Sequence, residues 1–183
     1  MFLHQLPIVR TRGLRRGVGS LAVAVATVGT LAMTAAPAHA DTVTGTEQGD
    51  VLTGTGADDL IKGLGGGDII NGRNGHDVIL GGNGSDRVRA GRGADAVYGG
   101  NGSDIVKGGQ GPDVLHPQQG TDVVKAGPGD DTIYLYDDNK LDQVFCGKGS
   151  DTVYYPEDEW DFQDEFSDCE TFVEMSDITD YQG

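Results

Sequence analysis

The sequence predicts an all-β solenoid of short strands, and three periodic features of the chain predict it. Aspartate recurs every nine residues, ten times without a slip. Glycines keep the same interval from Gly66 to Gly111, and a branched aliphatic residue follows each aspartate by two positions. A fixed period of this kind is typical of repeat proteins whose units stack on their neighbours. The periodic aspartates are Asp50, Asp59, Asp68, Asp77, Asp86, Asp95, Asp104, Asp113, Asp122 and Asp131.

Residues 1–40 have the order of a secretory signal peptide. Four arginines lie among the first sixteen residues, an apolar run from Val18 to Ala36 follows, and Ala38-His39-Ala40 is a small-residue cleavage site. The apolar run is also about long enough for a transmembrane anchor. Its small residues and the cleavage site favour a signal, so we expect a secreted, extracellular protein without a membrane span after signal removal. Arg15-Arg16 leaves open whether export follows the general or the twin-arginine route.

From Asp41 onward the chain is strongly acidic. This part holds all 29 acidic residues but only nine Lys and Arg, because four of the 13 lie in the signal, so its formal net charge is −20. Phosphates attract basic surfaces, so we expect no nucleic-acid partner. So many carboxylates also repel one another in a compact state unless something neutralises them.

One repeat unit reads Gly99-Gly100-Asn101-Gly102-Ser103-Asp104-Ile105-Val106-Lys107. It resembles the G-G-x-G-x-D-x-U-x nonapeptide of the RTX, or haemolysin-type, calcium-binding repeat family, where U is a large aliphatic residue. The resemblance implies a right-handed parallel β-roll in which two units make one turn. On this basis residues 41–154 are the expected calcium-binding solenoid. Residues 135–145 are degenerate, after an apparent two-residue insertion at Leu135-Tyr136.

The resemblance also implies calcium ions as the ligand. Calcium takes six to eight oxygens, and glycine-rich turns can direct main-chain carbonyls inward. In the family, aspartates of units n and n+2 both contribute to a site. The candidate ligands are therefore the ten periodic aspartates and Asp151. The units that begin at Gly45 and Gly54 have Gln48 and Ala57 where the family has glycine, so these two units depart from the family's pattern.

The aspartate column also admits a structural explanation, because aspartate bonds to the backbone in turns. Carboxylates stacked about 5 Å apart, however, repel by nearly 1 kcal/mol per neighbour in water. We therefore predict that folding is coupled to calcium binding and that the calcium-free chain is largely disordered.

Residues 155–183 are predicted to form an acidic C-terminal cap and tail. The aromatic residues Trp160, Phe162, Phe166 and Phe172 favour a cap over the last coil at 155–174, the alternative being a disordered acidic tail. Cys146 and Cys169 are the only cysteines, and in an exported chain we expect a disulfide between them rather than two free thiols.

We predict that the protein is not an enzyme, because the sequence contains neither a Gly-x-Ser-x-Gly elbow nor a His-Glu-x-x-His motif. Two functions remain. One is a secreted calcium-binding protein that folds on several ions held between stacked turns. The other is a calcium-stabilised cell-surface or matrix adhesion scaffold, with a cell-wall or matrix polysaccharide or protein as partner. For the second, Arg87, Arg89 and Arg92 form a basic cluster that either faces the partner or is a solvated face.

Overall fold

The computed structural model describes residues 39–136, 138–156 and 164–175, and these residues contain fifteen strands and no helix. The predicted signal peptide lies almost wholly outside them. Within the described residues, no helix of a length and apolarity sufficient to cross a bilayer is found. The strands are β1 (Thr42–Thr44), β2 (Val51–Thr53), β3 (Leu60–Gly65), β4 (Ile69–Asn74), β5 (Val78–Asn83), β6 (Arg87–Arg92), β7 (Ala96–Asn101), β8 (Ile105–Gln110), β9 (Val114–Gln119), β10 (Val123–Pro128), β11 (Thr132–Tyr134), β12 (Gln143–Lys148), β13 (Thr152–Pro156), β14 (Glu165–Ser167) and β15 (Thr171–Met175).

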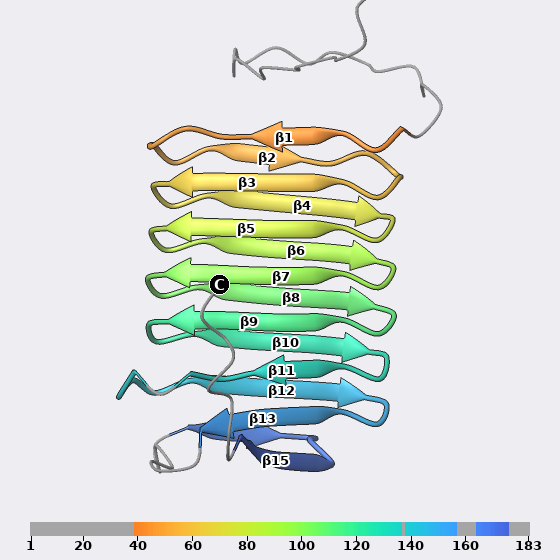
Figure 1. The fold of residues 1–183 in the computed structure, drawn as a ribbon, viewed down its shortest axis with the longest axis vertical. Coiled ribbons are helices and arrows are strands. Elements are labelled where there is room, and N and C mark those ends of the chain that lie inside the picture. Colours follow the sequence, from red (N-terminus) through yellow and green to blue (C-terminus); the bar gives the residue numbers. More distant parts are fainter. Residues whose placement is uncertain (1–38, 137, 157–163, 176–183) are drawn as a thin grey trace, which may run out of the picture.

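The strands form two parallel sheets that run the length of the molecule (Figure 1). The odd-numbered strands form one sheet of eight, which we call the odd sheet, and the even-numbered strands form the even sheet of seven. Leu60 pairs with Val78, and Val78 with Ala96, so neighbouring strands of one sheet are two repeat units apart. Each coil therefore uses one pair of units, and the strands make about seven coils. The predicted all-β parallel solenoid is confirmed.

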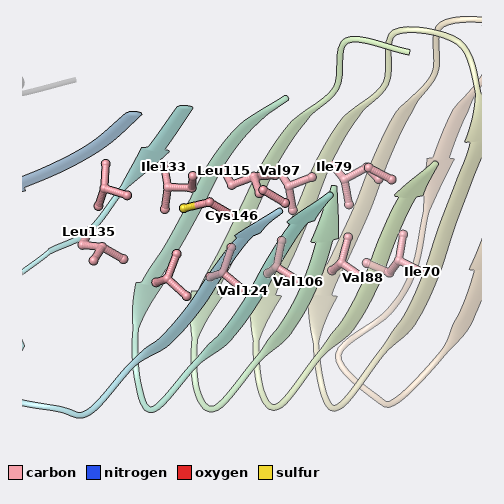
Figure 2. Packing of buried hydrophobic residues seen from close by; sticks show 14 of the residues in the cluster. Ile70, Ile79, Val88, Val97, Val106, Leu115, Val124, Ile133, Leu135 and Cys146 are labelled. Carbon is pink, nitrogen blue, oxygen red and sulfur yellow. The ribbon is translucent and has the colours of Figure 1, made fainter. Parts of the chain in front are cut away.

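The interior is a double row of aliphatic side chains (Figure 2). Ile79, Val97 and Leu115 point inward from the odd sheet, and Val88 and Val106 point inward from the even sheet, each 0–2% exposed. Glycine or another small residue lies at most of the other inward positions, so each nine-residue unit contributes little more than one large apolar side chain. Burial of such a side chain stabilises by about 1.5–3 kcal/mol. This hydrophobic core is small, and small cores usually need further stabilisation by a bound metal or a disulfide.

The coils change length toward the C-terminal end. Val123 pairs with Gln143, twenty residues away, where earlier pairs are eighteen residues apart. This difference matches the predicted two-residue insertion. Strands β14 and β15 then extend both sheets by pairing with β12 and β13. In the predicted cap, Phe166 packs edge-on against Phe172, whereas Trp160 and Phe162 lie outside the described residues.

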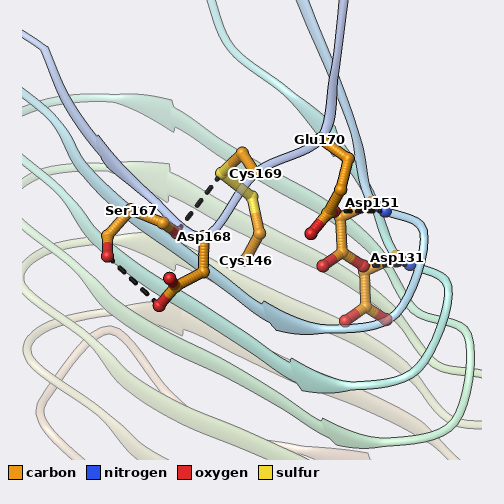
Figure 3. The surroundings of a disulfide bond; sticks show 7 residues. All are labelled: Asp131, Cys146, Asp151, Ser167, Asp168, Cys169 and Glu170. Carbon is orange, nitrogen blue, oxygen red and sulfur yellow. Dashed lines mark hydrogen bonds between the residues drawn. A yellow bond between two sulfur atoms is a disulfide. The ribbon is translucent and has the colours of Figure 1, made fainter.

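A disulfide joins Cys146 on β12 to Cys169, between β14 and β15 (Figure 3). The predicted cysteine pair is thus confirmed. The bond closes a 23-residue separation and fastens the last coil to the repeats.

The outward face of the odd sheet carries stacked rings. His116 lies between Tyr98 and Tyr134, with ring centroids 4.7 and 4.6 Å away, and Tyr154 stacks on Tyr134 at 4.8 Å. Burial in this stack lowers the pKa of His116 below its ordinary value.

Candidate metal centre

The periodic aspartates lie in the turns that join the two sheets, in two rows along the two edges of the solenoid. Asp68, Asp86 and Asp104 each precede a strand of the even sheet, while Asp77 and Asp95 each precede a strand of the odd sheet. All of these side chains are 1–2% exposed. Buried charge is costly unless it is paired or bound to a metal, so these rows need an explanation.

One oxygen of each carboxylate has a protein partner. The backbone N–H of Asp86 donates to Oδ1 of Asp104, and that of Asp104 donates to Oδ1 of Asp122, both at 2.8 Å. The same bond joins the two members of every n and n+2 pair among the ten periodic aspartates, and also joins Asp131 to Asp151. The pairs expected from the family resemblance are therefore neighbours in space.

The second oxygen, Oδ2, is buried without a hydrogen-bond partner in nine of the predicted ligands. Buried polar atoms are nearly always bonded, so nine orphaned oxygens in one small protein are exceptional. The nine are Asp68, Asp77, Asp86, Asp95, Asp104, Asp113, Asp122, Asp131 and Asp151.

Burial and neighbouring charges also destabilise the ionised form of these carboxylates. Burial raises the pKa of Asp122 to about 8 and that of Asp113 to about 7, from an ordinary value of 3.8. The backbone N–H bond opposes this rise, and the neighbouring carboxylates of the row add to it. Rows of this kind are stabilised by any cation or proton that reaches them.

Five of the nine orphaned oxygens, those of Asp68, Asp77, Asp86, Asp104 and Asp113, face a main-chain carbonyl across a glycine. A Cβ added at Gly99 would lie 2.5 Å from the carbonyl oxygen of Pro117 and 2.6 Å from Oδ2 of Asp104. Glycine leaves open the space on which these two oxygens converge. Carboxylate and carbonyl oxygens are the donors that calcium prefers. Within residues 39–136, 138–156 and 164–175, no three Asp, Glu, His or Cys side chains form a metal-holding group.

The first two aspartates differ from the others. The backbone N–H of Thr46 donates to Oδ2 of Asp50 at 2.7 Å, and that of Thr55 donates to Oδ2 of Asp59 at 2.6 Å. The two threonine hydroxyls donate to the same oxygens. Most later units have at this position a glycine with positive φ, such as Gly100 at +114°, and the turn then points the N–H elsewhere. The Oδ2 atoms of Asp50 and Asp59 thus have protein partners, unlike those of the nine later aspartates.

The sequence reasoning missed this role of threonine, and it also missed three acidic residues that extend the rows. Asp122 donates its N–H to Asp142 Oδ1 at 2.8 Å, and Asp142 donates to Asp164 Oδ1 at the same distance. In the other row, Asp151 donates to Glu170 Oε2 at 3.0 Å (Figure 3). The in-phase position of Asp142 after the insertion was the available signal.

The comparison with family models agrees with this geometry. A model described as RTX calcium-binding nonapeptide repeat (4 copies) matches residues 40–79, 80–115 and 118–153, more than half of the chain. The matched segments include all eleven predicted ligands. No curated protein and no solved structure shows significant similarity to the chain.

Proposed function

Because the chain belongs to the RTX calcium-binding nonapeptide repeat family, we propose that it is a secreted protein whose repeats fold when several calcium ions lie between neighbouring coils. The observation that carries the proposal is the set of nine buried aspartate oxygens without a protein partner. Calcium would supply the positive charge that these rows lack. The residues that hold it are the nine aspartates, together with carbonyls of the glycine-rich turns. Asp50 and Asp59 contribute less, because threonine already occupies their second oxygen.

The site of action that we propose is the extracellular space. The arginine-rich start, the apolar run and the Ala38-His39-Ala40 site support export. A disulfide is also stable in an oxidising compartment. Extracellular calcium modules bind with dissociation constants of about 10⁻⁴–10⁻³ M. A chain of this kind stays unfolded at low calcium and folds after export.

The proposal includes no catalytic step. The two histidines after the signal region have structural surroundings: His76 Nδ1 accepts the backbone N–H of Ala94 at 2.8 Å, and His116 lies within the ring stack. The paired carboxylates follow the repeat rather than a cleft.

Far-UV circular dichroism and calorimetry of the purified protein test the proposal. We expect a strand spectrum in calcium, a coil spectrum in chelator, and heat from several ions during titration. Magnesium at the same concentration is the control, because it demands a small octahedral shell and keeps its waters. The same ordered spectrum in chelator and in calcium would refute coupled folding. Recovery of the product from the medium with Asp41 as its first residue tests export.

A further inference from the structure

The basic residues of this acidic chain are gathered on one surface. Six of the nine Lys and Arg residues after the signal region project from β4, β6, β8 and β10 of the even sheet, and all six are exposed. Lys148 on β12 extends the group. None of the five even-sheet strands β4, β6, β8, β10 and β12 contains an aspartate or glutamate. We call the six residues the basic face: Arg73, Arg87, Arg89, Arg92, Lys107 and Lys125.

Part of the basic face is a row of like charges in register. Arg89 pairs with Lys107, and Lys107 pairs with Lys125, so three cations project side by side from neighbouring strands. Like charges directly opposite each other destabilise a sheet. Among the described residues, no carboxylate is joined to any of the three; Lys125 lies only over the Phe145 ring, 5.3 Å from its centroid. Stability alone does not account for such a row.

The basic face also contains a hollow of about 540 Å³. Arg73, Arg89 and Arg92 line it together with Asn71 and Gln110. Arg73 has φ of +87°, in a column where the paired residue on the next strand is Gly91. The later units require a positive φ at this position, and Arg73, like Leu64 and Gln118 of the odd sheet, adopts it without being glycine. The hollow thus combines guanidinium groups, which bind carboxylates bidentately, with side-chain amides that can bond hydroxyls.

We propose that the basic face binds a linear polysaccharide that bears carboxylate groups, laid along the axis of the solenoid. The row of Arg89, Lys107 and Lys125 runs along this axis and presents a cation at each successive strand. The amides in the hollow suit sugar hydroxyls. Nucleic acid is disfavoured, because Phe145 is the one aromatic side chain on strands β4, β6, β8, β10 and β12, and Lys125 already lies over its ring.

If the proposed function is right, calcium strengthens this binding. The aspartate row of Asp68, Asp86 and Asp104 borders the same sheet, at the turns from which β4, β6 and β8 begin. Ions that neutralise this row remove the negative field beside the basic face, and the attraction for an anionic polymer rises.

Binding of hyaluronan, a carboxylated polysaccharide, tests the inference when it is measured in calcium with neutral dextran and single-stranded DNA as comparison ligands. We expect hyaluronan to bind, dextran not to bind, and DNA to bind at least tenfold more weakly. The triple variant Arg89→Gln, Lys107→Gln, Lys125→Gln should weaken hyaluronan binding by ten- to a hundredfold and flatten its salt dependence. The control, Lys62→Gln with Lys140→Gln, removes two positive charges away from the basic face and should leave binding unchanged.

Equal binding to DNA, or equal affinity of the triple variant and the control, would overturn the inference. Removal of the like-charge row does not weaken the fold, and circular dichroism of the same samples in calcium checks this. A chain that folds on calcium but ignores hyaluronan refutes the basic-face inference alone. A chain that is already folded in chelator refutes the proposed function instead, and hyaluronan binding is then judged without calcium.

Discussion

Replacement of Asp104 by asparagine should change stability in opposite directions with and without calcium. Oδ1 of Asp104 accepts the N–H of Asp86 at 2.8 Å, while Oδ2 is buried and unpaired. Asparagine keeps an acceptor for Asp86, removes the charge, and places an amide that can donate toward the Pro117 carbonyl beside Gly99. The variant therefore loses a calcium ligand but also relieves the carboxylate row.

The magnitudes follow from the neighbours of Asp104. At about 1 mM calcium and a dissociation constant of about 10⁻⁴ M, each ion stabilises the fold by about 1.4 kcal/mol. Asp104 lies between two coils, so the loss is about 1.4–3 kcal/mol in calcium. Without calcium, removal of the charge relieves repulsion from Asp86 and Asp122. At about 5 Å this repulsion is nearly 1 kcal/mol per neighbour in water, and about 3 kcal/mol at an effective dielectric constant of 20.

Asp59→Asn is the matched control. Oδ2 of Asp59 accepts the N–H of Thr55 at 2.6 Å, and Oδ1 accepts that of Asp41 at 2.8 Å. Asparagine can accept at only one of these positions, and a hydrogen bond to a charged group is worth about 1.5–3 kcal/mol. The control variant should therefore be destabilised in both conditions.

Urea unfolding in calcium, and the folded fraction in chelator with sucrose, measure the two effects. Sucrose favours the compact state and makes the calcium-free fold observable. We expect Asp104→Asn to lower the urea midpoint in calcium and to raise the folded fraction in chelator. If it instead lowers both, as Asp59→Asn should, the orphaned oxygen is not a calcium ligand and the reasoning fails.

Three further predictions concern pH, the disulfide and the glycine turns. Burial raises the pKa of Asp122 to about 8 from 3.8, so the calcium-free fold binds protons more tightly than the unfolded chain. Protonation of Asp122 therefore stabilises the calcium-free fold. This stabilisation is complete below pH 4 and is lost as pH rises toward 8. Acidification from pH 8 to 5 in chelator should increase strand content by circular dichroism, and an unchanged spectrum would contradict the shift. Reduction of the Cys146–Cys169 disulfide, which closes a 23-residue separation, should lower the free energy of unfolding measured in urea by about 3 kcal/mol. A decrease below about 0.5 kcal/mol would show that the last coil does not depend on the disulfide. Gly102→Ala, at φ +132°, should cost more than 1 kcal/mol, whereas the exposed Gly56→Ala should stay within about 0.5 kcal/mol, and equal effects would argue against the turn geometry.

The repeat columns made most of the fold predictable. The aspartate and aliphatic columns share one period, so any pairing that buries Val88 beside Val106 also aligns Asp86 with Asp104. The glycine column is explained by the same register, because a Cβ at Gly102 would overlap the carbonyl oxygen of Gly84, eighteen residues earlier. Local pattern and global packing thus specify a single register.

The remaining features depend on contacts that break the period. Asp164 follows Asp142 by 22 residues, and Glu170 follows Asp151 by 19, so neither residue keeps the eighteen-residue interval of the repeat. Thr46 and Thr55 are inconspicuous in sequence, and only the turn conformation directs their N–H groups at Asp50 and Asp59. The separation of basic residues onto the even sheet likewise requires knowledge of which units alternate.

Small-angle X-ray scattering of the 143 residues that follow Ala40, in chelator and in calcium, tests the central claim most directly. If calcium holds the coils together, the radius of gyration in chelator should be near the value of about 39 Å for an unfolded chain of this length. In calcium it should fall to roughly 15–20 Å, as expected for a short stack of coils. A radius below about 20 Å in chelator, unchanged by calcium, would contradict the account.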